Sequence, residues 1–251
     1  MASTDSPPDS AVSKNASPAI KRALISVSDK SDLVPFAERL VNLGVEIFST
    51  GGTRKRLAEA GLEVRDIADY TGFPEMMDGR LKTLHPKIFG GLLARHDRPD
   101  DMSGLEEHGI QTFELVVVNL YPFEQTIARA GVTDAEAIEQ IDIGGPSLVR
   151  AAAKNHAFTT IVTAPDQYES VLDEIAETGS TTLATRRSLA GAAFAKTANY
   201  DAAIADYFAR NETGPESLRR QWQKKSSLRY GENPHQEASV YVDLNLSLIH
   251  I

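Results

Sequence analysis

The chain has 251 residues, of which 41% are hydrophobic, and it carries a formal net charge of -9 at pH 7. This length suits one domain of about 200 residues with appendages. The acidic balance argues against general nucleic-acid binding, which needs a surplus of Lys and Arg facing phosphates. The absence of cysteine excludes disulfides, thiolate metal sites and cysteine nucleophiles.

The sequence gives three further expectations, about membranes, metals and the N-terminal residues. No apolar run approaches about 18 residues, so no membrane span is expected. The six histidines have no close metal-ligand spacing, so no metal is predicted. Residues 1–20 are rich in Ser, Pro, Ala and Asp and lack the apolar core of a signal peptide, so they are predicted to form a disordered cytoplasmic tail.

The first elements alternate between strands and helices. A buried strand is predicted over Arg22–Ser28, followed by an amphipathic helix over Leu33–Leu43 with Ser31 as its N-cap. The next predicted elements are a strand over 45–48, a helix over 54–60 and a short strand over 63–67. This rhythm predicts an α/β fold with a parallel sheet and right-handed crossovers.

The alternation of strands and helices is interrupted after residue 67 and continues beyond residue 98. Residues 68–98 are dense in turn-forming residues, and we expect them to form a long binding loop. Beyond it, the predicted elements are a helix over 102–108, a buried strand over 114–119, a helix from Thr133 to 140, a strand over 159–162, a helix over 164–177, a long helix over 183–209 and a linker over 211–225.

The stretch from Asp142 to His156 combines several chemical signals. Asp142 precedes two glycines and Pro146, which can take the first position of a helix, and a helix start favours an anion. Lys154 lies about 12 Å along that helix from Pro146, so it would serve a different part of a ligand. A tight structural turn with a surface lysine remains the alternative.

Polar loops follow several predicted strands, at the edge where parallel sheets bind ligands. These loops are Ser26–Lys30, Ser49–Thr53, Asn119–Pro122 and Asp142–Gly145. Ser49–Thr53 is the best phosphate candidate, because its glycines admit close approach and its hydroxyls donate hydrogen bonds. Arg80 and Lys82 alternate across Leu81 and would suit a phosphate or a developing oxyanion.

Taken together, these motifs resemble one known family. The matching segments are Ser26–Lys30, Ser49–Thr53, Thr71–Glu75, Arg80–Pro86, Asn119–Phe123, Asp142–Gly145, Arg150–His156 and Arg229–Gln236. They are similar to the bifunctional purine biosynthesis family, which joins an IMP cyclohydrolase domain of methylglyoxal synthase-like fold to a formyltransferase. The resemblance implies an open, mainly parallel sheet with helices on both faces over residues 21–210. It also implies ring closure of a formamidoimidazole-carboxamide ribonucleotide to IMP with loss of water.

The resemblance further implies roles for individual residues. The implied catalytic residues are Lys82, Tyr121, Asp142 and Lys154, with Asp142 accepting the carboxamide proton, Lys82 stabilising the formyl oxygen and Lys154 donating or accepting a proton. The implied substrate-binding residues are Ser28, Lys30, Thr50, Gly51, Gly52, Thr53, Arg80, Thr83, Asn119, Ile143 and Gly144. No cofactor is implied for the cyclohydrolase, and the implied partners are a purine ribonucleotide and a second copy of the chain in a cytoplasmic homodimer.

The C-terminal part departs from the family pattern. Residues 226–251 are expected to be the start of a formyltransferase domain, whose co-substrate in the family is 10-formyltetrahydrofolate. Arg229 and Tyr230 would bind its second substrate but stand without the rest of that site, and residues 243–251 do not follow the family pattern. Two other functions remain as alternatives, a methylglyoxal synthase-type lyase and a non-catalytic nucleotide-sensing module.

Overall fold

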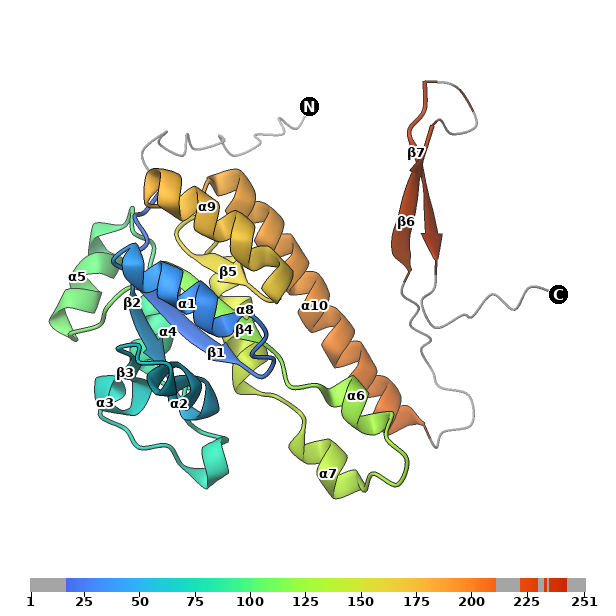
Figure 1. The fold of residues 1–251 in the computed structure, drawn as a ribbon, viewed down its shortest axis with the longest axis horizontal. Helices are drawn as coiled ribbons and strands as arrows, with labels where there is room; N and C mark the ends of the chain where they lie inside the picture. The colour runs from blue at the N-terminus through green and yellow to red at the C-terminus, as the bar shows by residue number, and fades with distance from the viewer. Residues whose placement is uncertain (1–16, 211–221, 230–232, 234, 243–251) are drawn as a thin grey trace, which may run out of the picture. The chain divides into compact units, whose positions relative to one another are not determined.

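A parallel sheet forms the centre of the fold. The structure, a computed structural model, describes residues 17–210, 222–229, 233 and 235–242. Its five-stranded sheet has the order β3-β2-β1-β4-β5, and every neighbouring pair is parallel (Figure 1). The strands are β1 (Arg22–Val27), β2 (Glu46–Ser49), β3 (Arg65–Asp66), β4 (Leu115–Asn119) and β5 (Thr160–Val162). β4 is buried along its whole length, as its run of valines predicts.

Helices connect the strands and cover the sheet. They are α1 (Leu33–Asn42), α2 (Gly51–Glu59), α3 (Ile67–Thr71), α4 (Pro86–Leu93), α5 (Pro99–Glu107), α6 (Phe123–Ile127), α7 (Asp134–Glu139), α8 (Gly144–Lys154), α9 (Tyr168–Thr178) and α10 (Leu183–Ala209). Two 3₁₀ turns, Met77–Gly79 and Pro165–Gln167, complete the described helical elements.

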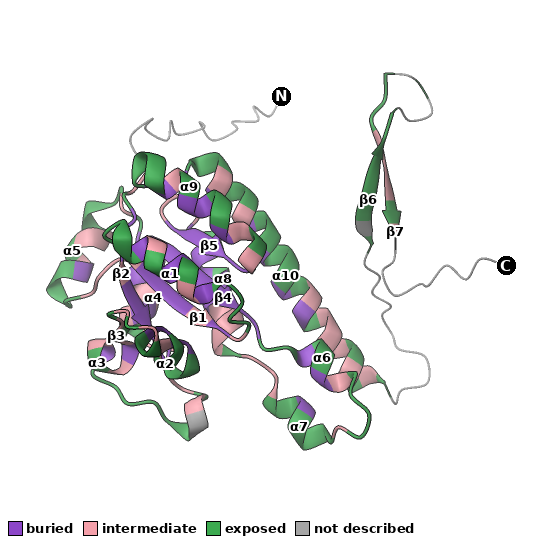
Figure 2. Ribbon diagram, in the orientation of Figure 1, coloured by how far each residue is buried: buried purple, intermediate pink, exposed green. Residues whose placement is uncertain are grey.

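Both faces of the sheet are covered. On one face α1 packs beside α9, where the rings of Phe36 and Tyr168 stack 4.1 Å apart over the apolar side chains of β1 and β4. On the other face α8 packs on β4 and β5, and α4 packs on α8. Buried Asn155, just after α8, donates to the carbonyls of Leu92 and Ala94 at the end of α4. Figure 2 shows the buried strands between these helices, whose outer faces are exposed. The open α/β fold with helices on both faces is therefore confirmed.

The strand order places a switch point between β1 and β4. The chain leaves β1 toward β2 and β3 on one side, and it leaves β4 toward β5 on the other side. The loops after β1 and β4 therefore diverge, and in open parallel sheets the crevice between such loops is where ligands bind. This topology alone points to the carboxyl ends of β1 and β4.

The chain divides into two compact units, Met1–Thr197 and Ala198–Ile251. The first unit contains the five-stranded sheet. The second contains a two-stranded antiparallel hairpin of β6 (Gln223–Leu228) and β7 (Ala238–Val242). The predicted linker over 211–225 lies partly outside the described residues, and its last three residues belong to β6 instead.

Several local expectations were wrong. Ser31 does not cap α1, because its backbone N–H and hydroxyl both donate to the Asp29 carboxylate and Asp32 takes the cap position. The expected loop over 68–98 contains α4, whose start is capped by the His85 ring and has a proline in its first turn. Ile20, expected in a disordered tail, is buried and donates to the Gly179 carbonyl. Residues 1–16 of that tail lie outside the described residues.

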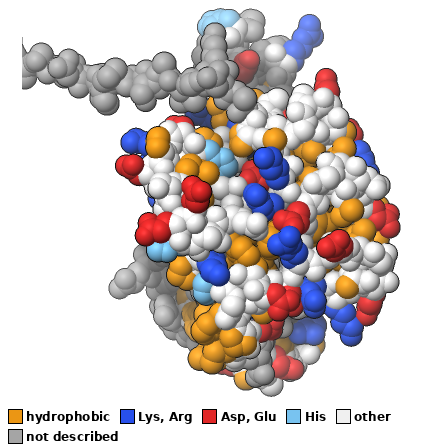
Figure 3. Space-filling model, turned by 90° about the vertical axis from the view of Figure 1, so that its left-hand side faces the viewer, with side chains coloured by type: hydrophobic (Ala, Val, Ile, Leu, Met, Phe, Trp, Pro, Cys, Tyr) orange, Lys and Arg blue, Asp and Glu red, His pale blue; other side chains and the backbone are white. Residues whose placement is uncertain are grey.

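The charges of the first unit are dispersed on the side seen in Figure 3. Lys and Arg side chains alternate there with Asp and Glu side chains. This face has no large area of one sign, unlike the continuous basic surface that a phosphate backbone attracts.

Candidate active site

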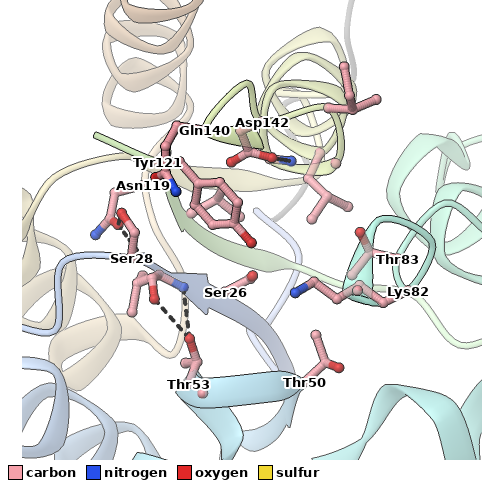
Figure 4. Close-up of a pocket in the computed structure, with 18 of the residues that line it drawn as sticks. Ser26, Ser28, Thr50, Thr53, Lys82, Thr83, Asn119, Tyr121, Gln140 and Asp142 are labelled. Atoms are coloured by element: carbon pink, nitrogen blue, oxygen red, sulfur yellow. Dashed lines mark hydrogen bonds between the residues drawn. The ribbon is translucent and has the colours of Figure 1, made fainter. Parts of the chain in front are cut away.

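A pocket of about 750 Å³ opens where the topology predicts a ligand, at the carboxyl ends of β1 and β4. Ser26 and Ser28 line it from the β1 side, and Asn119 and Tyr121 line it from the β4 side (Figure 4). Its volume falls in the range of about 300 to 1,000 Å³ that is typical of small-molecule sites.

Asn119 joins the two diverging loops at the base of this pocket. Its side-chain oxygen accepts hydrogen bonds from the backbone N–H of Ser28 at 2.6 Å and of Asp29 at 2.9 Å, and from the Ser28 hydroxyl at 2.9 Å. Its amide group donates to the Asp29 carbonyl at 3.0 Å. Asn119 is 8% exposed, so these bonds are shielded from water and fix the loop after β1 against the end of β4.

The loop after β2 leads directly into a helix. Thr50 is extended and α2 begins at Gly51, where φ is +53°, a conformation that favours glycine. Lys30 brings its ammonium to about 4.0 Å from the position that a methyl group on Gly52 would take. A free helix start with a lysine beside it is suited to an anion.

Thr53, which lines the pocket, also joins α2 to β1. Its hydroxyl donates to the Val27 carbonyl and accepts from the Val27 backbone N–H, both at 3.0 Å. The Thr53 side chain therefore holds α2 against the end of β1, and the backbone of the helix start is what faces the pocket.

Asp142 and the start of α8 form another wall. The Asp142 carboxylate accepts a hydrogen bond from the Gly145 backbone N–H at 2.8 Å. A methyl group on Gly145 would lie 2.3 Å from Asp142 Oδ2 and 3.0 Å from Leu120, so any larger residue there would displace the carboxylate or the start of α8. α8 begins at Gly144 rather than at Pro146, because the Asp142 carboxylate already satisfies one of the first free N–H groups.

The Asp142 carboxyl is perturbed in a way that suits proton transfer. Burial raises its pKa above the ordinary value, whereas hydrogen bonds from the backbone N–H groups of Gly145 and Tyr121 and the charge of Lys82 act to lower it. Burial is the largest of these effects, so the pKa is raised overall. A partly buried carboxylate with a raised pKa is a stronger base than an exposed one.

A tight hairpin carries Lys82 into the pocket. Met76 and Leu81 pair across the turn, and within it Met77 and Gly79 adopt positive φ of 55° and 87°. The Lys82 ammonium lies 3.5 Å from the position of a methyl group on Gly79 and 3.7 Å from that of one on Gly51. The lysine therefore lies beside the start of α2, on the pocket side of the hairpin (Figure 4).

Arg80 comes from the same hairpin and forms an ion pair with Glu139, the last residue of α7. Both residues line the pocket, and both side chains are more than half exposed. The pair therefore connects the hairpin with α7 at the open side of the site.

Most of the residues expected at the site meet in this one pocket. Those that line it are Ser28, Lys30, Thr50, Gly52, Thr53, Arg80, Lys82, Thr83, Asn119, Tyr121, Asp142, Ile143 and Gly144. Gly51 lies just behind the lining, next to Lys82.

Lys154 does not join them. It is the last residue of α8, exposed and absent from the pocket lining. The eleven residues of α8 extend about 15 Å from Gly144 to Lys154. Lys154 therefore lies outside this pocket, and its expected role in binding or proton transfer stays a prediction.

The residues expected for the formyltransferase lie in the second unit. Arg229 is exposed just after β6, and Tyr230 lies outside the described residues.

Ser26, which lines the pocket, belongs to the loop Ser26–Lys30 that the sequence predicts at this edge. Three other polar or glycine residues of the lining, Gly79, Glu139 and Gln140, were not predicted from the sequence. No sequence pattern indicates a binding role for Glu139 or Gln140, because polar residues are common at the end of a surface helix.

The described part of the chain holds neither a metal-binding cluster nor a membrane-spanning helix. Over residues 17–210, 222–229, 233 and 235–242, no cluster of three or more His, Asp or Glu side chains has a geometry that could hold a metal ion. In the same ranges, no helix has both the length and the apolar character needed to cross a membrane.

Comparisons with known proteins give two family matches that follow each other along the chain. The MGS-like domain matches residues 32–147, and the AICARFT/IMPCHase bienzyme matches residues 152–249. Most of the pocket lining lies in the first match.

Individual relatives agree with these matches. The chain is 56% identical over 227 residues to the bifunctional purine biosynthesis protein PurH of Rhodopirellula baltica, covering 89% of this chain and 43% of the relative. It is 57% identical over 224 residues to PurH of Bacillus subtilis, covering 88% of this chain and 44% of the relative. The chain thus spans less than half the length of these curated relatives.

A solved structure is similar over its whole length. The crystal structure of ForH has 35% sequence identity and a TM-score of 0.70, and the match covers 77% of this chain and 100% of that one. The sequence motifs, the parallel fold, the two consecutive family matches and these relatives agree: the chain belongs to the bifunctional purine biosynthesis protein family.

Proposed function

We propose that this chain is an IMP cyclohydrolase, which closes the second ring of a purine from 5-formamidoimidazole-4-carboxamide ribonucleotide. The observation that carries the proposal is that Lys82 and Asp142 line one pocket together with the anion-binding start of α2. A base, a cation and a phosphate site in one crevice are what the cyclisation of a mononucleotide requires.

The phosphate would bind at the start of α2. The backbone N–H groups after Thr50 and the ammonium of Lys30 supply hydrogen bonds and positive charge there. Gly51 and Gly52 allow the phosphate to approach the backbone closely. Anchoring the ribose phosphate in this way leaves the base of the nucleotide to reach toward Asp142 and Lys82.

The chemical step joins two groups of one molecule. The carboxamide nitrogen attacks the formyl carbon and gives up a proton to the Asp142 carboxylate, while the Lys82 ammonium stabilises the formyl oxygen as it gains negative charge. The formyl oxygen takes up a proton to become a hydroxyl group. That hydroxyl then leaves as water, as the formamido nitrogen loses its proton and a carbon–nitrogen double bond forms.

The enzyme's main contribution would be geometric. The reacting groups already belong to one molecule, so fixing their mutual orientation removes much of the remaining entropic barrier. The bonds of Asn119 to the loop after β1 and of Asp142 to α8 hold the two walls in a fixed arrangement. Tyr121 and Thr83 line the space where the imidazole ring would lie.

The wider family properties are part of the same proposal. We propose residues 21–210 as the cyclohydrolase domain and residues 226–251 as the beginning of a formyltransferase region. The formyltransferase of the longer relatives would use 10-formyltetrahydrofolate, and the cyclohydrolase would need no cofactor. A cytoplasmic location and a homodimer follow from the same family membership.

A turnover assay separates this function from its two alternatives. The chain is supplied in parallel with the formamido ribonucleotide and with dihydroxyacetone phosphate, and IMP and methylglyoxal are measured. We expect IMP from the first substrate and no methylglyoxal from the second. Methylglyoxal alone would identify a lyase, and nucleotide binding without turnover would identify a sensing module; either result overturns the proposal.

A further inference from the structure

Among the described residues that line the pocket, Glu139 is the carboxylate that the proposed mechanism does not use. It ends α7, whose start is fixed by the capping box between Thr133 and Glu136 and whose middle is anchored by buried Ala137. A carboxylate at the C-terminal end of a helix is disfavoured by the helix dipole. Its position therefore calls for a partner outside the helix.

That partner is Arg80 on the Lys82 hairpin. The two side chains form a charge-assisted hydrogen bond, and both lie in the pocket lining. The Arg80 side chain is 67% exposed, so without a fixed partner it would sample many rotamers. The bond to Glu139 therefore restricts the orientations of the guanidinium at the open side of the site.

The chemistry of the guanidinium allows it to serve two acceptors. Arginine has five N–H donors in a rigid fork, and one carboxylate cannot occupy all of them. An arginine that is already held by a carboxylate loses less freedom when a ligand oxygen binds to it.

We infer that Glu139 is a positioning residue, which holds Arg80 across the pocket entrance in the orientation that binds the nucleotide. The inference rests on the proposed nucleotide substrate. Glu139 acts through Arg80 and makes no contact with the reacting atoms, so it should affect binding of the substrate and leave the chemical step unchanged.

The test compares Glu139→Gln, Glu139→Asp and wild type in steady-state cyclisation and in calorimetric titration with IMP. We expect Glu139→Gln to raise KM and the IMP dissociation constant by about 5-fold, the effect of losing one exposed ion pair, with kcat within about 2-fold of wild type. Glu139→Asp keeps the charge on a shorter side chain and should give an intermediate value.

Two controls distinguish positioning from a structural effect. Glu59→Gln removes another exposed ion pair, with Lys55, at the far end of α2 and outside the pocket, and it should leave KM unchanged. In about 1 M salt the Debye length falls to about 3 Å, so the ion pair is screened. The difference in KM between wild type and Glu139→Gln should then disappear.

Three results would overturn the inference: an unchanged or lower KM in Glu139→Gln, a fall in kcat at constant KM, or a difference that persists in high salt. Wild-type protein that binds IMP without turnover would refute the proposed cyclohydrolase alone, and the ratio of IMP dissociation constants would still decide the role of Glu139. Wild-type protein that neither turns over nor binds IMP would refute both.

Discussion

Lys82 and Asp142 line the same pocket from separate segments of the chain, and the positive charge of Lys82 lowers the pKa of the Asp142 carboxyl. Burial acts in the opposite direction and is the larger effect, so the pKa lies above the ordinary value of 3.8. The lysine therefore helps to keep a partly buried base ionised. Each residue supports the role proposed for the other.

Removing the Lys82 charge should raise the pKa of Asp142 further. In Lys82→Gln the only change at the carboxylate is the loss of an attractive charge, so its protonated form becomes more favourable. The measurement is a carbon-13 NMR titration of the Asp142 carboxyl, with Lys55→Gln on the outer part of α2 as the control. An equal or lower pKa in Lys82→Gln would contradict the electrostatic coupling.

The same shift predicts the acidic limb of the pH–rate profile. If Asp142 must be ionised to accept a proton, activity is present above its raised pKa and is lost as the pH falls through it. The limb should therefore lie above the range of an exposed aspartate, and kcat measured from about pH 3 to about pH 8 checks this. A limb at or below about 3.9 would contradict it.

Gly145→Ala should impair catalysis more than stability. The added methyl group would meet Asp142 Oδ2 at 2.3 Å, so the carboxylate or the start of α8 must move. A displacement of about 1 Å in a catalytic group can cost about 10²-fold in rate, and we expect kcat to fall by that order. Gly104→Ala in α5, where no atom lies within 4 Å of the new methyl group, is the control and should keep full activity. Full activity of Gly145→Ala would show that this close approach does not matter.

Asn119→Ala should weaken both the fold and nucleotide binding. It leaves the backbone N–H groups of Ser28 and Asp29 without their acceptor in a mostly buried place, which costs about 1 to 3 kcal/mol. Urea unfolding should show a free energy of unfolding lower by about 2 kcal/mol, whereas exposed Asn42→Ala should change it little. An unchanged unfolding midpoint in Asn119→Ala would contradict this role.

His96 should make the fold less stable in mild acid. Burial lowers its pKa below the ordinary value of 6.5, while Glu114 and Asp97 partly oppose this, and its ring stacks on Phe158 at 4.9 Å. Below about pH 6.5 the unfolded chain takes up a proton that the folded chain resists, so stability is lost as the pH falls toward the lowered pKa.

The matched variants for this effect are His96→Phe, which keeps an aromatic ring against Phe158, and exposed His108→Gln. Thermal unfolding is measured between pH 5 and pH 8. The melting temperature of His96→Phe should fall less with decreasing pH than that of wild type, whereas the melting temperature of His108→Gln should fall as steeply as that of wild type. Equal slopes in all three proteins would exclude His96 as the cause.

The sequence predicted the framework well because its signals were local. The valines of β4 read as a buried strand, the Thr133 capping box gave the start of α7, and α10 was placed at its observed bounds. The site loops were found because glycines and hydroxyls after buried strands meet at one edge of a parallel sheet.

The errors arose where one local bond replaces another, or where contacts distant in sequence decide the structure. Ser31 had the chemistry of a helix cap, but the nearby Asp29 carboxylate bonds it instead. The expected loop over 68–98 holds α4, which is stabilised by packing on α8 rather than by a strong pattern of its own. Glu139 was missed because its partner, Arg80, lies far from it in the sequence.

The role of Lys154 could be predicted only in part from residue spacing and from likeness to the family. The distance along the helix correctly separated it from the start of α8, yet spacing could not say which face or which site it serves. Its catalytic role stays a prediction, since the pocket of this chain does not include it.

The most direct test is a single-turnover measurement of IMP formation by wild type, Lys82→Met and Asp142→Asn, with IMP affinity measured on each protein. We expect both variants to bind IMP within about 10-fold of wild type and to form it at least about 10²-fold more slowly, because each loses a group that acts in the transition state. Variants that cyclise the substrate at the wild-type rate would contradict the proposal that these two residues perform the chemistry.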